Sequence, residues 1–170
     1  MPAPLLEEIA QLYQKTEDWI RDDQTTAYGA DDLHPLSEHA RMPRKGEDYR
    51  ASFFHSPALS INSHVHAAVA LIGGTAHRCY RMEPGQGFRI HSDDYFGGQS
   101  SRILYLNRNW VWDWGGLLHV IEADSCRVVF PEFNLLATMD YAQGKVPHFV
   151  SQVAPWALEP RYILSVFGGS

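Results

Sequence analysis

The stretch Tyr80-Arg-Met-Glu-Pro-Gly-Gln-Gly-Phe-Arg-Ile-His-Ser-Asp93 is the part of the sequence from which both the fold and the chemistry are predicted. Within it, Pro84-Gly85 is a turn signal between two strand-like segments. In an extended strand, residues two apart project from the same face, so the imidazole of His91 and the carboxylate of Asp93 can reach one point. These ligand types suit a metal ion. The stretch therefore predicts two strands joined by a turn, with two metal ligands at the end of the second strand.

The composition of the chain indicates one globular domain. Of its 170 residues, 45% are hydrophobic and 20% are charged, which is enough to build one sizeable core. The formal net charge is -6 and the sequence pI is about 5.8, whereas a general nucleic-acid binder shows a basic surface and a high pI. Nucleic acid is therefore not expected as a partner.

Neither the apolar segments nor the cysteines point to a membrane protein or a secreted one. No segment is apolar for long enough to span a bilayer, and residues 1–8 lack the basic-then-apolar order of a signal peptide. We expect no membrane partner and a cytoplasmic location. Cys79 and Cys126 are too few for a disulfide framework or a zinc cluster, and both are predicted to be buried free thiols.

Two amphipathic helices are predicted before the strands. In the first, apolar residues recur at helical spacing over residues 5–20. The second begins at Ser56-Pro57 and stops at Gly73-Gly74. His64 and His66 fall within it, where residues two apart point about 200° apart, so this pair is discounted as a metal site.

Between these helices, residues 21–56 show no hydrophobic periodicity. A loop of this length in a compact domain is usually functional or disordered. Its basic residues are Arg41, Arg44, Lys45 and Arg50. Two interpretations stay open for this segment: a lid that closes over a site and recognises an anionic group of the substrate, or a solvated surface excursion.

From residue 77 onward the pattern changes to short strands separated by Gly and Pro. Eight such strands fit a closed or sandwiched antiparallel fold. We therefore predict one mainly β domain over residues 1–170, with a helical N-terminal part (1–76) that includes the long loop, and a jelly-roll core (77–167). The predicted strands are His77–Glu83, Gly87–Asp93, Ser101–Asn107, Leu117–Glu122, Cys126–Phe130, Leu135–Asp140, His148–Val153 and Arg161–Phe167.

Several motifs follow His91-Ser-Asp93 in a fixed order. They are Ser101-Arg-Ile-Leu-Tyr-Leu-Asn107, Trp114-Gly-Gly-Leu-Leu-His119, Pro147-His-Phe-Val150 and Pro160-Arg-Tyr162. With them the chain resembles the prolyl 4-hydroxylase-like branch of the Fe(II)/2-oxoglutarate-dependent dioxygenases over roughly residues 80–167. The resemblance implies a double-stranded β-helix (jelly-roll) core with N-terminal α-helices packed on it.

The resemblance also implies a metal site and its cofactors. His91, Asp93 and His148 would hold Fe(II) and are the implied catalytic residues. Two His and one carboxylate on one face of Fe(II) leave positions open for the co-substrates 2-oxoglutarate and O2.

A cationic anchor is implied for the far carboxylate of 2-oxoglutarate. Arg161 is the candidate, because an arginine fork can grip a carboxylate through two hydrogen bonds. Tyr105 matches a family position whose hydroxyl helps to hold the same carboxylate. Where the family often carries a tyrosine before the His-x-Asp strand, this sequence has Met82, so Tyr80, two residues earlier on the same face, is the substitute candidate for cofactor binding.

The implied activity is hydroxylation of an unactivated C–H bond, with desaturation or cyclisation using the same ligands. Related halogenases carry a small residue where this chain has Asp93, so a carboxylate here favours hydroxylation.

The small size of the chain favours a free amino acid or other small metabolite as the substrate. A prolyl-type peptide or protein side chain is the alternative, and a non-catalytic jelly-roll ligand- or metal-binding protein is the alternative of another class. Trp110, Trp112 and Trp114 either line the substrate mouth or cover a core.

Overall fold

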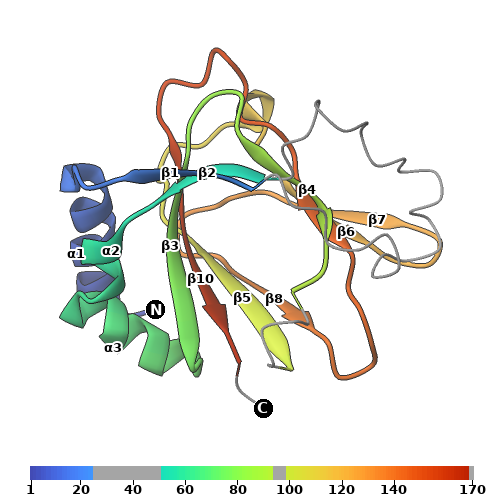
Figure 1. Cartoon of the computed structure of the whole chain (residues 1–170), viewed down its shortest axis with the longest axis horizontal. Coiled ribbons are helices and arrows are strands. Elements are labelled where there is room, and N and C mark those ends of the chain that lie inside the picture. Colours follow the sequence, from blue (N-terminus) through green and yellow to red (C-terminus); the bar gives the residue numbers. More distant parts are fainter. Residues whose placement is uncertain (25–50, 94–98, 169–170) are drawn as a thin grey trace.

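The structure is a computed structural model and describes residues 1–24, 51–93 and 99–168. Ten strands and three α-helices are found in this part of the chain (Figure 1). In order, the elements are α1 (Ala3–Lys15), β1 (Ile20–Gln24), β2 (Ala51–His55), α2 (Pro57–Ser60), α3 (Ser63–Ile72), β3 (Ala76–Met82), β4 (Gly87–His91), β5 (Ser100–Tyr105), β6 (Leu118–Ile121), β7 (Cys126–Val129), β8 (Leu136–Asp140), β9 (His148–Val150) and β10 (Arg161–Phe167). A short 3-10 helix, Trp112–Trp114, precedes β6.

The strands pair antiparallel in the order β7-β6-β9-β4-β2-β3-β10-β5-β8, and β1 adds to β2. Strand β2 pairs with both β3 and β4, so it connects two layers. Residues from both layers pack together in one interior core, which confirms the predicted jelly roll. Its buried members are Phe53, Tyr80, Met82, Ile103, Tyr105, Trp110, Leu118, Val120, Met139, Tyr141, Val150, Val153 and Ile163.

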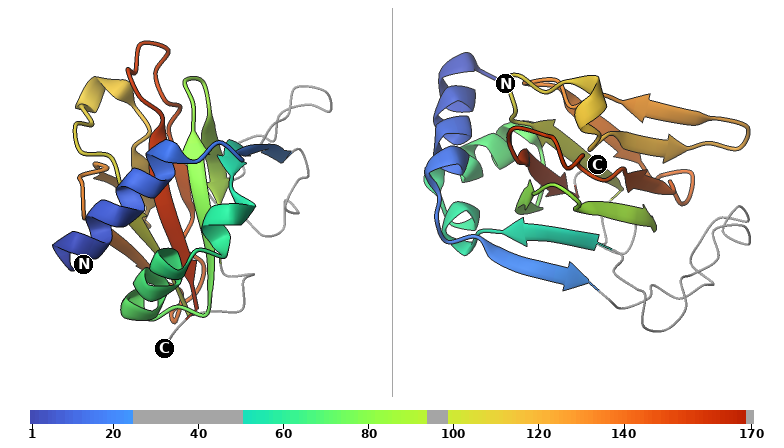
Figure 2. Two further views of the ribbon diagram at one scale, coloured as in Figure 1. Left: turned by 90° about the vertical axis from the view of Figure 1, so that its left-hand side faces the viewer. Right: turned by 90° about the horizontal axis from the view of Figure 1, so that it is seen from above.

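The helices α1 and α3 lie against the outer face of the layer that contains β3 and β10 (Figures 1 and 2). They build a second core, the outer core, with side chains that point away from the interior. A hydrogen bond also joins α1 to β10, because the buried hydroxyl of Tyr13 donates to the carbonyl of Ile163 at 3.0 Å. The buried members of the outer core are Leu6, Ile9, Tyr13, Leu59, Val65, Ala68, Val69, Cys79, Leu104, Leu106, Tyr162, Leu164 and Val166.

Strand β10 is buried along its whole length, because it lies between β3 and β5 and is covered on both faces. Alternation along a strand sends successive side chains to opposite faces. Ile163 therefore belongs to the interior core, whereas Leu164 belongs to the outer core. The same alternation directs Arg161 into the interior.

All eight strands predicted from residue 77 onward are present, with ends that differ by up to three residues. Two further strands, β1 and β2, were missed, so the prediction that residues 21–56 lack regular structure is wrong at both ends. Strand β1 has the sequence Ile-Arg-Asp-Asp-Gln, which carries no apolar alternation, and charge on an edge strand discourages pairing with other chains. The predicted lid falls mainly on residues 25–50, which lie outside the described residues.

Both predicted helices are shorter than expected. The first ends at Lys15, and Ile20 begins β1 with half of its surface exposed. The second is divided into α2 and α3, each with its own N-cap, because the Ser56 side chain accepts from the Leu59 N–H and the Asn62 side chain accepts from the His64 N–H. Such caps are typically worth about 1 kcal/mol each.

The helical spacing of Ile61, Val65, Val69 and Ile72 predicts one apolar stripe on the second helix. This prediction is wrong for Ile61, which lies at the break between α2 and α3 and is 82% exposed. The predicted stop is confirmed at Gly73, which has a left-handed φ of 85°.

The two cysteines differ from each other. Cys79 is buried in the outer core, as predicted, but Cys126 is exposed on the edge strand β7, so the prediction of two buried thiols is wrong for Cys126. Among the described strands, β7 has a neighbour on one side only. The short apolar pattern around Cys126 does not distinguish such an edge strand from a central one. In the part of the chain that the structure describes, no helix is long and apolar enough to cross a membrane.

Candidate active site

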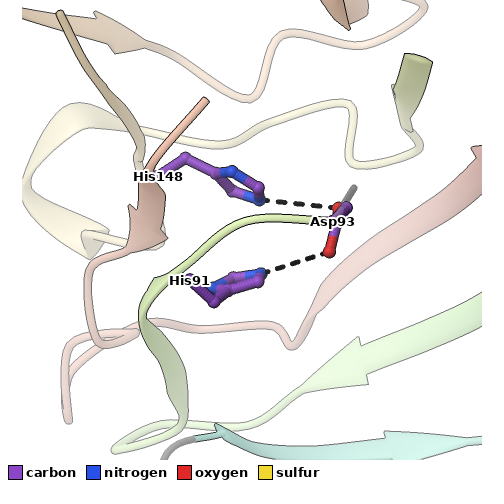
Figure 3. Close-up of side chains that lie close together, drawn as sticks. All are labelled: His91, Asp93 and His148. Atoms are coloured by element: carbon purple, nitrogen blue, oxygen red, sulfur yellow. Dashed lines mark ion pairs between the residues drawn. The ribbon is translucent and has the colours of Figure 1, made fainter. Parts of the chain in front are cut away.

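His91, Asp93 and His148 lie close together, with their side chains pointing toward one another (Figure 3). One ligand atom from each lies within 4.8 Å of the other two. His91 Nε2 is 3.6 Å from Asp93 Oδ1, and His148 Nε2 is 3.5 Å from Asp93 Oδ2. Asp93 lies two residues after the end of β4 rather than in the strand, yet its carboxylate still converges with the two imidazoles.

The two histidine rings are held in the same way. His91 Nδ1 lies 2.6 Å from the carbonyl of Arg89, and His148 Nδ1 lies 2.9 Å from the carbonyl of Val146. A carbonyl can only accept, so each Nδ1 carries the hydrogen. Nε2 of each ring therefore faces Asp93: it can donate to the carboxylate when the ring is protonated, and it offers its lone pair to a metal when the ring is neutral.

Asp93 is partly buried but keeps its charge. Burial raises the pKa of its carboxyl, but a hydrogen bond from His148, the charges of both histidines and a hydrogen bond from Ser101 outweigh this, so the pKa is lowered. Ser101 in turn shares a 2.7 Å hydrogen bond with the hydroxyl of Tyr141. The predictions did not include Ser101 or Tyr141, because neither residue type distinguishes such a contact from ordinary core packing.

A second cluster of polar atoms lies at the start of β10. Arg161 is completely buried, and its Nε and Nη2 have no hydrogen-bond partner among the described residues; the same is true of the buried Tyr105 hydroxyl. The guanidinium carbon lies 5.1 Å from the centre of the Tyr105 ring. Burial lowers the pKa of Arg161 and raises the pKa of Tyr105. An anion with two oxygens would satisfy these three donors, which is what a carboxylate offers.

The walls around Arg161 fix its position. Met82 is its register partner on β3, and Arg161 Nη1 points to the Met82 sulfur at 3.6 Å. On the other side, Gly116 leaves no room: a Cβ added there would lie 2.8 Å from Arg161 Cδ. Trp110 holds the glycine turn by donating Nε1–H to the Gly115 carbonyl at 2.9 Å. Met82 was considered only as a departure from the family pattern, and its contact with Arg161 was not foreseen.

Tyr80 lies in the interior core with its ring against Phe53 and Phe88, and its register partner on β10 is Ile163. Its part in cofactor binding stays a prediction.

Two of the three tryptophans lie together, because Trp114 packs edge-on against Trp110 with ring centres 5.2 Å apart. Trp110 is buried in the interior core, while Trp112 is 62% exposed and stacks on Phe130.

Comparison with known proteins agrees with this geometry. Residues 77–168 match the model of the 2OG-Fe(II) oxygenase superfamily, while no curated protein matches the sequence. Among solved structures, a Pseudomonas putida prolyl-4-hydroxylase is 20% identical with a TM-score of 0.57, covering 98% of this chain and 100% of that one. A Trichoplax adhaerens prolyl hydroxylase, solved with a hypoxia inducible factor oxygen degradation domain peptide fragment, is 14% identical with a TM-score of 0.52, covering 96% of this chain and 88% of that one.

At these identities, the likeness to the solved structures concerns the fold. The superfamily match, in contrast, spans more than half of the sequence and includes the three clustered ligands. The chain therefore belongs to the 2OG-Fe(II) oxygenase superfamily and is a dioxygenase that depends on Fe(II), 2-oxoglutarate and O2.

Proposed function

We propose that this dioxygenase hydroxylates an unactivated C–H bond of an amino acid or other small metabolite. His91, Asp93 and His148 hold the Fe(II), while Arg161 and Tyr105 bind the far carboxylate of 2-oxoglutarate. The observation that carries the proposal is the convergence of the three ligand atoms within 4.8 Å, with both histidines tied by Nδ1. Bound iron supplies the oxygen-activating chemistry, with 2-oxoglutarate as the source of electrons.

The protein orients the three metal ligands. Because Nδ1 of each histidine donates to the backbone carbonyl of Arg89 or Val146, Nε2 is the nitrogen that each ring would offer to the metal. Asp93 supplies the negative charge, because its lowered pKa keeps the carboxylate ionised at neutral pH. A preorganised set of two nitrogens and one oxygen is the facial triad that suits Fe(II) and leaves positions for other ligands.

The pocket around Arg161 favours a bound anion. A buried guanidinium with unsatisfied Nε and Nη2 costs free energy until an anion pairs with it. The Tyr105 hydroxyl stays protonated, since burial raises its pKa, and so it can donate to the same anion.

Hydroxylation is favoured over halogenation because Asp93 provides a carboxylate in the triad. A halide would need the place that this carboxylate takes. The same ligand set serves desaturation or cyclisation, and product analysis separates these outcomes from hydroxylation.

The test is formation of succinate from 2-oxoglutarate by the purified protein, with dependence on added Fe(II) and O2. Metabolite pools and proline-containing peptides are then screened by mass spectrometry for the gain of one oxygen atom. A gain in a small metabolite supports the proposal, and a gain confined to peptides would replace it with a peptidyl hydroxylase. Absence of succinate under all conditions would instead indicate a binding protein without turnover.

A further inference from the structure

A groove of about 430 Å³ lies between the edges of the two layers. Among the described strands, β7 and β8 are the two ends of the strand order, and each has one neighbour. Figure 1 shows β7 on the right and β8 below it, nearer the middle of the molecule. The walls come from the end of β6, the β6–β7 turn, β8 and the segment 145–147 before β9. Its volume falls in the lower part of the range of small-molecule sites.

The bottom of the groove adjoins the metal ligands. Val120 lines it and is the register partner of His148. Met139 also lines it and is the register partner of Ser101, which donates a hydrogen bond to Asp93. Two residues of the groove wall are thus strand neighbours of the triad region, through β6–β9 and through β5–β8, although none of the three ligands lines the groove itself.

The lining of the groove is divided by depth. Its buried members are the apolar residues Val120, Met139 and Pro147. The exposed members include charged residues of both signs, namely Glu122, Arg127, Asp140 and Lys145. An occupant that matches this pattern has an apolar part directed inward and two opposite charges at the rim.

The charged rim is held in place by local contacts. Asp140 Oδ1 accepts the Ala142 N–H at 2.9 Å, which fixes its carboxylate at the end of β8. Arg127 Nε lies 3.6 Å from Glu122 Oε1, with both side chains more than half exposed. An exposed ion pair of this kind is worth at most about 1 kcal/mol, so a ligand carboxylate can compete for the guanidinium.

We propose that this groove binds the substrate, and that the substrate is a free α-amino acid with an apolar side chain. The ammonium would pair with Asp140, the carboxylate with Arg127 and Lys145, and the side chain would extend over Val120 and Met139 toward the metal site. A residue inside a peptide brings neither backbone charge, so it would leave this rim without matching partners. The inference rests on the proposed function and names the substrate class for the same active centre.

Binding is tested without turnover, using the protein loaded with Zn(II) and 2-oxoglutarate and titrated with L-leucine, L-isoleucine and L-proline by calorimetry or ligand-observed NMR. The N-acetyl and carboxamide derivatives of the same amino acids each remove one charge. Asp140→Asn removes the rim carboxylate but keeps the oxygen that accepts the Ala142 N–H. Asp124→Asn is the matched control, because Asp124 is exposed in the β6–β7 turn and does not line the groove.

We expect at least one free amino acid to saturate the protein, and its derivatives to bind roughly tenfold or more weakly, as for loss of one charge-assisted hydrogen bond. Asp140→Asn should weaken binding to a similar degree, Arg127→Gln should do the same, and Asp124→Asn should bind as the wild type does. Equal binding of the derivatives, saturation by proline-containing peptides alone, or no saturation by any amino acid would each overturn the inference. Succinate formation by the wild type separates these outcomes from failure of the proposed function, because it needs no amino acid.

Discussion

His91 and His148 are direct register partners across β4 and β9, with ring centres 4.3 Å apart, and each is tied by Nδ1 to the carbonyl two residues before it. The pair of strands thus brings the two imidazoles together, and local backbone contacts set their rotation. Asp93 completes the set from the segment after β4 (Figure 3). The metal site therefore depends on strand pairing more than on any loop.

Loss of either histidine should remove turnover and weaken metal binding. We expect His91→Ala and His148→Ala to lower the affinity for Co(II), used as a spectroscopic probe, by more than about a hundredfold, because loss of a ligand exceeds the 10- to 100-fold cost of losing an outer partner. His64→Ala is the control, since this exposed residue pairs with Glu8 on α1. Unchanged Co(II) titrations in either ligand variant would remove that residue from the site.

Replacing Arg161 by Leu should weaken the binding of 2-oxoglutarate. The carboxylate would then be buried without its partner, at a cost on the order of 3 to 5 kcal/mol, so the apparent KM should rise by about two orders of magnitude or more. Arg108→Leu is the control, because Arg108 is half exposed and pairs with Glu7. If the affinity of Arg161→Leu for 2-oxoglutarate equals that of the wild type, the carboxylate is held elsewhere.

Gly116→Ala should impair the same site by displacing the guanidinium. The added Cβ would lie 2.8 Å from Arg161 Cδ, and the φ of +63° adds a backbone cost of about 1 to 2 kcal/mol. Gly85→Ala carries the same kind of backbone cost at φ +85°, but nothing lies within 4 Å of its added Cβ. We expect both variants to lose stability in urea unfolding and Gly116→Ala alone to lose affinity for 2-oxoglutarate. Equal affinities in the two variants would show that Gly116 does not position Arg161.

The two cysteines should react at very different rates. Burial raises the pKa of Cys79 to about 11, so its thiol is both inaccessible and protonated. Cys126 is exposed, with its sulfur 3.8 Å from His119 Nδ1. Mass spectrometry after treatment with iodoacetamide should find the native protein labelled at Cys126 and the unfolded protein labelled at both. Native labelling of Cys79 at a comparable rate would mean that the outer core opens readily.

Asp18 should make the stability of the protein depend on pH. The hydrogen bond from Ser56 lowers the pKa of Asp18 below its ordinary value of 3.8. A carboxyl with a lowered folded-state pKa stabilises the protein above its unfolded pKa, and this contribution is lost as the pH falls through the folded-state pKa. Asp18→Asn should thus destabilise the protein at neutral pH but much less in acid, as measured by urea unfolding. In a Ser56→Ala background this pH dependence should shrink, and an unaltered dependence would assign it to another group.

Sequence patterns predicted the β core well because apolar and polar residues alternate along its strands, and because Gly and Pro separate one strand from the next. The spacing of His91 and Asp93 indicated a metal site, whereas Arg161 was implied only by the resemblance to the dioxygenase family, and its role stays a prediction. In contrast, β1 escaped prediction because Asp22 and Asp23 conceal any apolar alternation. Contacts such as Met82 with Arg161 depend on the register of β3 against β10, and register between distant strands is set by the packed layers rather than by either segment alone.

Because β10 is covered on both faces, truncation of the N-terminal part would uncover one of them. The superfamily match begins at residue 77, but β2, at residues 51–55, fills the place between β3 and β4, and α1 contacts β10 through Tyr13. A fragment cut at residue 77 would expose Leu164 and its outer-core neighbours to water and loosen the strand that carries Arg161. The proposed anchor for 2-oxoglutarate therefore depends on the N-terminal part of the chain, and we expect the smallest fragment that binds the co-substrate to include the N-terminal helix.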